Sequence, residues 1–170
     1  ISTGLIEIIF NKNNPFILLD SHINILLSDV KQILYELLEL VLEQHKVNIK
    51  FPKLGLIMIN SLKDVINQYY IDCSNKIKDL LLVEKECIFT DDHKFRNDLL
   101  PKLGGNNNKP EQIRVILLGY YTSIVTILKH NIHKYVQVFF VHQFLDNINK
   151  HLLELTNSNT SYSNLLEENT

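Results

Sequence analysis

The fold is decided by residues 110–155, which read PEQIRVILLGYYTSIVTILKHNIHKYVQVFFVHQFLDNINKHLLEL. Apolar side chains recur there at steps of three and four, a spacing that keeps them on one side of an α-helix. They are Ile113, Leu117, Tyr120, Ile124, Leu128, Ile132, Tyr135, Phe139, Leu145, Ile148, Leu152 and Leu155. At about 1.5 Å per residue, an unbroken helix over this stretch would be roughly 65–70 Å long. A helix of that length needs long partners, so the sequence predicts an all-α, elongated antiparallel helical bundle.

Two more long helices are expected before this stretch, at residues 16–44 and 54–89. The first carries a stripe of Ile23, Leu26, Val30, Ile33, Leu37 and Leu40, which Leu34, Leu38 and Val41 widen into a broad apolar face. The second carries Leu54, Met58, Leu62, Val65, Tyr69, Cys73, Ile77 and Leu80. Residues 45–53 read as a turn, in which Pro52 prepares the next helix. Three long helices with short connections run up, down and up.

The break between the second and third helices contains Pro101 and the run Gly104-Gly105-Asn106-Asn107-Asn108, residues that favour loops. We therefore expect a flexible loop at residues 96–110. It separates residues 1–95, which hold the first two helices, from residues 111–170. The second part consists of the third helix, at 111–155, and a polar tail.

Composition excludes several classes of protein. The net charge of −2 argues against a nucleic-acid-binding domain, which is normally basic. The two cysteines, Cys73 and Cys87, have no CxxC spacing, which favours buried free thiols and a reducing, cytosolic setting. No apolar run approaches the roughly 20 residues that cross a bilayer.

The sequence offers no motif for catalysis or for a cofactor. The five glycines form no phosphate-binding loop, so we expect no nucleotide on this chain. His130 and His133 could share a helix face, with His142 further along, but neither a cysteine nor a carboxylate is suitably placed among them. We therefore expect exposed or interfacial histidines, no metal site and no enzymatic activity within this chain.

Residues 135–141, YVQVFFV, are apolar nearly all round the expected helix. Only His142, in the gap between Phe139 and Leu145, places a polar residue in the stripe. Neighbouring helices cover about half of a helix surface, so part of this segment must be buried in another way. Two interpretations remain open: burial inside the chain's own fold, or contact with a partner.

Three blocks of sequence resemble the stalk of the dynamin superfamily, which consists of a middle domain and a GTPase effector domain. The first block is Thr3-Gly4, Phe10 and Phe16, and the second is Phe51-Pro52-Lys53-Leu54 followed by Glu84, Ile88, Thr90 and Phe95. The third, which is similar to the effector domain, includes Ile113-Arg114, Tyr120-Tyr121, Ile124-Val125, Ile132, Lys134, Val136, Phe139, Val141, Asp146 and Leu165-Leu166-Glu167-Glu168. His133 departs from the pattern, because the family usually has proline there.

The resemblance implies a stalk that dimerises and then forms helical filaments around membranes, in the cytoplasm and peripheral to the membrane. Residues 1–95 would be the middle-domain part, and residues 111–170 the effector-domain part. GTP and Mg²⁺ would belong to a GTPase head outside this chain. That head and the bundle-signalling element would be partners of the stalk, beside further copies of the chain.

The resemblance also implies two functional surfaces. Its stalk–stalk contact would fall on Val138, Phe139, Phe140, Val141 and His142. Replacing Val141 with lysine would bury an unpaired charge there and dissociate the dimer. The loop at residues 96–110 takes the position of a membrane-facing insert, and an anionic membrane surface could contact Lys94, Arg96, Lys102, Lys109 and Arg114.

A different class of function remains open beside the stalk. A helical bundle can also act as an adaptor or scaffold that presents a groove to a partner helix. Self-association that depends on concentration separates the two, because a stalk should oligomerise alone and an adaptor need not.

Overall fold

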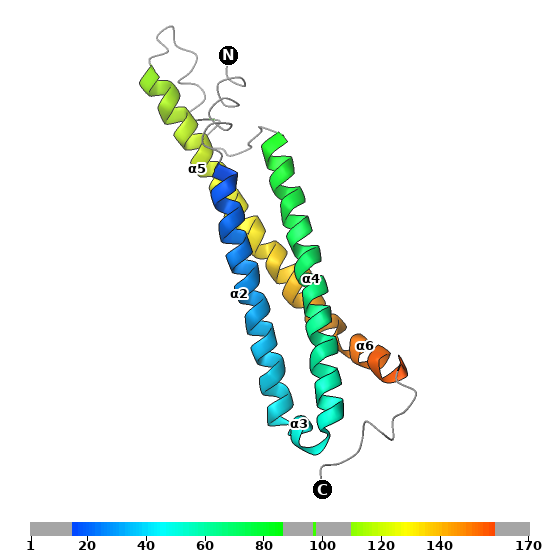
Figure 1. Cartoon of the computed structure of the whole chain (residues 1–170). Helices are drawn as coiled ribbons and strands as arrows, with labels where there is room; N and C mark the ends of the chain where they lie inside the picture. The colour runs from blue at the N-terminus through cyan, green and yellow to red at the C-terminus, as the bar shows by residue number, and fades with distance from the viewer. Residues whose placement is uncertain (1–14, 87–96, 98–109, 159–170) are drawn as a thin grey trace. The chain divides into compact units, whose positions relative to one another are not determined.

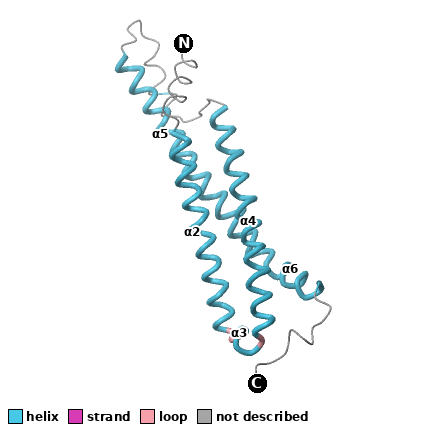
Figure 2. The backbone as a smooth tube through the Cα atoms, in the orientation of Figure 1, coloured by secondary structure: helices cyan, strands magenta, loops and turns pink. Residues whose placement is uncertain are grey.

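The computed structural model describes residues 15–86, 97 and 110–158 (Figure 1). Its elements, in order, are α2 (Pro15–Gln44), α3 (Val47–Lys50), α4 (Pro52–Glu86), α5 (Pro110–Tyr135), the π-helix η3 (Val136–His142) and α6 (Gln143–Ser158). Over this described part every element is helical and no strand occurs (Figure 2). With 30 and 35 residues, α2 and α4 are far longer than the usual ~11–12 residues. The predicted all-α helical bundle is confirmed.

Each of the three long helices begins at a proline: Pro15, Pro52 and Pro110. Proline suits this position because its φ angle is already helical and its missing N–H group would have no partner in the first turn. The predicted starts at 16, 54 and 111 therefore lie within two residues of those observed. Of the predicted loop at 96–110, only Asn97 and Pro110 are described, and the predicted helix end at 89 also lies outside the described residues.

The connection between α2 and α4 is more ordered than the predicted turn, because it contains α3. Lys46 takes a left-handed conformation with φ of 55°, and its N–H donates to the carbonyl of Glu43 at 2.9 Å. Gly55 packs closely on this connection, since a Cβ atom there would lie 3.2 Å from the Cα of Asn48. Glycine thus allows the start of α4 to approach α3.

The described residues divide into two compact units. The first unit contains residues 22–76 and 135–158, and the second contains residues 15–21, 77–86, 97 and 110–134. In the first unit, α2 and α4 run antiparallel and are joined by α3 (Figure 1). Its buried apolar side chains are Ile23, Leu27, Leu34, Leu38, Leu42, Leu62, Ile66, Cys73, Val136, Phe140 and Phe144. In the second unit the buried residues are Ile77, Leu81, Tyr120, Ile124, Leu128 and Ile132.

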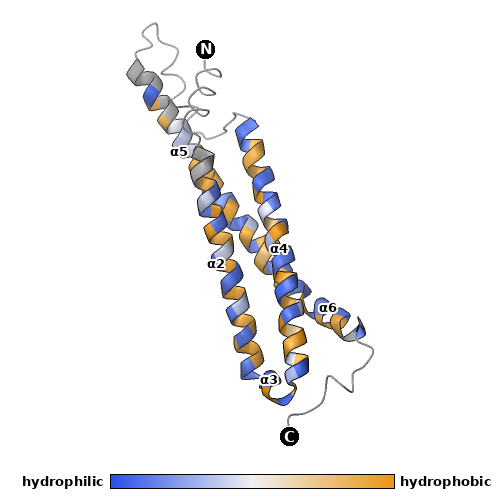
Figure 3. Ribbon diagram, viewed as in Figure 1, coloured by the Kyte–Doolittle hydropathy of each residue, from blue (hydrophilic) through white to orange (hydrophobic). Residues whose placement is uncertain are grey.

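The buried face of α2 differs from the predicted one. Apolar and polar residues alternate along α2 and α4 (Figure 3). Ile33, Leu37 and Leu40 were expected in the core but are 54%, 51% and 59% exposed. The helix has two overlapping apolar stripes, and the core takes the one that contains Leu34 and Leu38. On α4, two buried residues lie one position after the predicted ones. Ile66 and Leu81 are buried in place of Val65 and Leu80.

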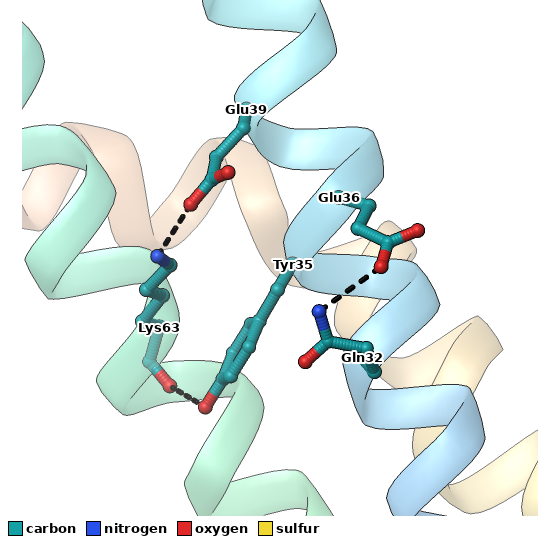
Figure 4. A network of polar contacts seen from close by, with 5 residues as sticks. All are labelled: Gln32, Tyr35, Glu36, Glu39 and Lys63. Carbon is teal, nitrogen blue, oxygen red and sulfur yellow. Dashed lines mark hydrogen bonds and ion pairs between the residues drawn. The ribbon is translucent and has the colours of Figure 1, made fainter.

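A polar network joins α2 and α4 in the first unit (Figure 4). Lys63 Nζ on α4 pairs with Glu39 Oε1 on α2 at 2.6 Å. The same ammonium group lies 5.4 Å from the centre of the Tyr35 ring, and the Tyr35 hydroxyl donates to the Lys63 carbonyl at 3.5 Å. Nearby, Gln32 donates to Glu36 at 3.0 Å, one turn further along α2. These contacts hold the polar edge of the pair together.

Candidate functional site

The candidate site is η3, the π-helical segment Val136–His142. It lies in the segment for which the sequence left open burial in the chain's own fold or contact with a partner. A π-helix has hydrogen bonds from residue i to i+5 and usually occurs as a single turn inside an α-helix, often at a functional site. Here the N–H of Gln143 points at the carbonyls of Val138 and Phe140. The predicted single α-helix over 110–155 is therefore wrong at this segment.

The π turn has a physical reason in the spacing of buried residues. Within the first unit, Val136, Phe140 and Phe144 are buried at steps of four. In an α-helix a step of four advances about 40° around the axis, so such a stripe would turn away from the core. A π turn takes in an extra residue and turns the residues that follow it back by about 100°. The prediction placed Tyr135 and Phe139 in the stripe because it continued the α-helical spacing, whereas Val136 and Phe140 are buried.

Cys73 on α4 contacts the beginning of η3. Its side chain is fully buried, and Sγ donates to the carbonyl of Tyr135 at 3.6 Å. Burial raises the pKa of the Cys73 thiol from 9.0 to about 11, although the nearby charge of Lys76 acts in the opposite direction. The thiol therefore stays protonated and unreactive at neutral pH. Cys73 is a buried free thiol, as predicted, and it supports η3.

Aromatic and cationic side chains contact two phenylalanines of η3. Phe140 is fully buried, with its ring edge-on to that of Tyr70 at 6.3 Å between centroids. Phe139 is half-buried between the Tyr135 ring, at 5.1 Å, and Lys76 Nζ, at 4.9 Å from the ring centre. These contacts anchor the segment on α4 and leave only part of its surface accessible.

The predicted self-association residues accordingly separate into two groups. Phe140 has no accessible surface with which to contact a second copy in this structure. Val138 is 46% exposed, His142 is exposed, and Phe139 and Val141 are half-buried. We call Val138, Phe139, Val141 and His142 the η3 surface. The prediction that they form a stalk–stalk contact stays a prediction.

The other predicted site residues are mostly beyond the described part of the chain. Lys94, Arg96, Lys102 and Lys109, from the predicted lipid-facing loop, lie outside it, and Arg114 is exposed on α5. His130 and His133 are exposed, and the Nδ1 atom of His133 hydrogen-bonds the carbonyl of Lys129 at 2.7 Å. In residues 15–86 and 110–158 no group of histidines, cysteines and carboxylates is arranged to hold a metal ion.

One exposed apolar surface differs from what the sequence predicts. The apolar residues of α2 that the core does not use lie at the surface of the first unit. Their repeating spacing of four and three was visible in the sequence, but it was assigned to the core. None of the helices in the described part is apolar over a length that could span a membrane.

The comparisons with known proteins bear on the segment that contains η3. Residues 105–170 match the family model of the dynamin GTPase effector domain. No curated protein and no solved structure matches the chain. The matched residues include α5, η3 and α6, and therefore the third of the three blocks that carried the resemblance. The chain is thus similar, over residues 105–170, to the GTPase effector domain of dynamins, and over these residues its resemblance to the dynamin superfamily is confirmed.

Proposed function

We propose that this chain is the stalk of a dynamin-like GTPase and acts by self-assembly. Copies dimerise through the η3 surface and then form helical oligomers that remodel or divide a membrane. GTP hydrolysis with Mg²⁺ takes place in a head domain outside this chain, and the stalk transmits its effect. The match to the effector domain and the long antiparallel helices support this proposal.

The single observation that carries the proposal is the partial exposure of η3. Val138 presents an apolar side chain that is 46% exposed, next to Phe140, which is fixed in the core. Apolar surface beside rigid anchors is typical of the centre of protein interfaces, where a few well-packed residues contribute most of the affinity. In a two-fold symmetric dimer, the η3 surface of one copy would cover the η3 surface of the other.

A dilution series measured by static light scattering tests the proposal. We expect the average mass of the purified chain to rise with concentration to at least that of a dimer, with filaments visible by electron microscopy at the highest concentrations. A mass that stays monomeric at every concentration would refute self-assembly.

The proposal includes peripheral contact with a membrane in the cytoplasm, through the predicted basic loop. Each lysine or arginine near an anionic surface contributes about 1 kcal/mol, and salt screens this attraction. Co-sedimentation with phosphatidylserine vesicles should therefore weaken as salt is added, and vesicles of phosphatidylcholine alone serve as the control. Absence of binding, or binding that salt does not change, would count against the lipid contact.

An adaptor that binds a partner helix is the second candidate function. The exposed apolar stripe of α2 favours it, because such a stripe can accept a helix in a groove-like contact. A chain that stays monomeric but captures a helix would support the adaptor.

A further inference from the structure

A half-buried tyrosine and a half-buried histidine join α4 to α6 in the first unit. The Tyr69 hydroxyl on α4 lies 3.3 Å from Nε2 of His151 on α6. Their rings also meet edge to face, with 6.1 Å between the centroids. On the other side of the histidine ring, Nδ1 lies 3.6 Å from Oε2 of Glu154. A phenol, an imidazole and a carboxylate are therefore neighbours in that order.

The carboxylate of Glu154 selects the nitrogen of His151 that carries the proton. An ionised carboxylate accepts hydrogen bonds and donates none, so it favours the proton on Nδ1. In the neutral ring the lone pair then lies on Nε2, and the Tyr69 hydroxyl is the donor of the bond at 3.3 Å. Nε2 is thus placed to take the proton of the phenol.

Packing holds this arrangement from both helices. The ring of Tyr69 lies edge-on to that of Phe144, a buried residue, with 6.4 Å between the centroids. Ile148 and Leu152, on the same helix as His151, pack against the core of the first unit. The His151 side chain is 24% exposed, so a small molecule can reach the pair from solvent.

Tyr35 provides a comparison within the same unit. Its hydroxyl also donates to a neighbouring helix, but the acceptor is the backbone carbonyl of Lys63, at 3.5 Å. A carbonyl accepts a hydrogen bond without taking the proton at neutral pH. A hydroxyl becomes a nucleophile when an adjacent base removes its proton during the attack. Of these two tyrosines, Tyr69 has such a base.

We propose that Tyr69 is an acylation site, at which an activated ester or thioester transfers its acyl group to the phenol oxygen. As that oxygen attacks the carbonyl carbon, the phenol proton moves to Nε2 of His151. The new C–O bond forms, and the bond to the aryloxide or thiolate leaving group breaks. Glu154 stabilises the imidazolium, which then gives its proton to the leaving group. The negative charge of Glu154 repels anionic electrophiles such as phosphate esters, so a neutral acyl group is favoured.

An acyl group on Tyr69 replaces the hydrogen atom that the hydroxyl donates to His151. The modified chain therefore loses the hydrogen bond that joins α4 to α6 at this point. The site uses no residue of the η3 surface, so the inference does not depend on self-assembly.

Reaction of the whole chain with p-nitrophenyl acetate tests the proposal. Mass spectrometry of peptide digests follows the acetylation of each tyrosine over time. Hydroxylamine cleaves tyrosine esters but not lysine amides, so it separates the two kinds of product. We expect Tyr69 to be acetylated about 100-fold faster than Tyr35, which is the lower end of what a positioned base contributes.

Two variants separate the base from the hydrogen bond. His151→Gln keeps an acceptor for the Tyr69 hydroxyl but cannot take its proton, so acetylation of Tyr69 should fall about 100-fold, to the rate of Tyr35. Glu154→Gln keeps an acceptor for Nδ1 but loses the charge, so the rate should fall about threefold. Acetylation of Tyr35 is the internal control and should stay the same in both variants. Circular dichroism checks that each variant remains helical.

Nitrogen NMR of the His151 ring tests the geometry without any reaction. We expect the neutral ring to carry its proton on Nδ1. A proton on Nε2 would overturn the proposal, because Tyr69 would then be the acceptor. Equal rates of acetylation at Tyr69 and Tyr35 would also overturn it, as would a Tyr69 rate that His151→Gln leaves intact.

Discussion

The η3 segment and α2 both carry more apolar side chains than one packing face requires, and they differ in what covers the excess. In η3, Phe140 packs against Tyr70, and Phe139 is covered by Tyr135 and Lys76. On α2, the aliphatic side chains of Ile33 and Leu37 remain more than half exposed. Long side chains on a neighbouring helix can thus cover an aromatic segment from the side.

Apolar surface beyond the core takes a different form in each region. In η3, the widened helix brings Phe140 into the core and leaves a small surface that includes Val138 and His142. On α2, an ordinary α-helix keeps a continuous stripe at heptad spacing. The first surface is short and lies beside buried side chains, and the second extends along several turns of the helix.

The largest expected difference between the two regions is in stability. Phe140→Ala removes a fully buried ring and should lower the free energy of unfolding by about 3–5 kcal/mol. Leu37→Ala removes an exposed side chain and should cost about 0.5 kcal/mol or less. Urea denaturation followed by circular dichroism measures both. Similar losses for the two variants would contradict the assignment of Phe140 to the core.

The next effect concerns the thiol that supports η3. Because the pKa of Cys73 is about 11 in the folded chain and 9.0 in the reference state, the folded state binds more protons between pH 9 and pH 11. The free energy of unfolding should therefore fall as pH rises through this window, by about 2 kcal/mol in total. Well below pH 9, the thiol is protonated in both states and contributes no pH dependence.

Cys73→Ala is the control for the thiol, because it retains every other group that titrates at high pH. Subtracting its unfolding free energy from that of the wild type, pH by pH, isolates the contribution of Cys73. A difference that stays constant from pH 8 to pH 11 would show that the thiol is not buried beside Tyr135.

A smaller effect is expected where Lys76 covers Phe139. Lys76→Ala removes a cation–π contact at 4.9 Å and should cost about 0.5–1 kcal/mol. It should also make the η3 surface more apolar. Increased fluorescence of a bound hydrophobic dye would report this change. Lys78→Ala, at an exposed neighbouring position, is the control. If the two variants behave alike, Lys76 does not cover the ring.

The smallest change in the free energy of unfolding is expected on the polar side of α2. The side chains of Glu39 and Lys63 are 54% and 32% exposed, so water and salt screen their ion pair. Glu39→Gln should lower stability by about 0.5 kcal/mol or less, and the loss should vanish at high salt. A loss as large as that of Phe140→Ala would show that the network, not the core, holds α2 on α4.

Much of the fold could be predicted because its signals are local. Pro15, Pro52 and Pro110 mark helix starts by their own covalent geometry, and long apolar stripes identify the helices. The buried face of α2 could not be predicted, because two stripes overlap and only tertiary packing selects between them. The π turn had one indirect signal: the apolar stripe skips from Phe139 to Leu145, which is longer than an α-helical step.

The site was predictable only in part for the same reason. The sequence showed that residues 135–141 are apolar on all sides, and it left open whether they are buried or contact a partner. Within one turn of η3, the structure buries Phe140 and exposes Val138, and the contact with a partner stays a prediction. Which of two adjacent residues faces the core depends on the register of η3, and the π turn shifts that register.

The most direct test of the central claim is sedimentation velocity of Val138→Lys beside Leu37→Lys. Both substitutions place a lysine at an exposed apolar position of the first unit, one on the η3 surface and one on the exposed apolar stripe of α2. If stalks self-assemble through η3, Val138→Lys sediments as a monomer at concentrations where the wild type and Leu37→Lys are dimers. A Val138→Lys variant that dimerises like the wild type would contradict the account.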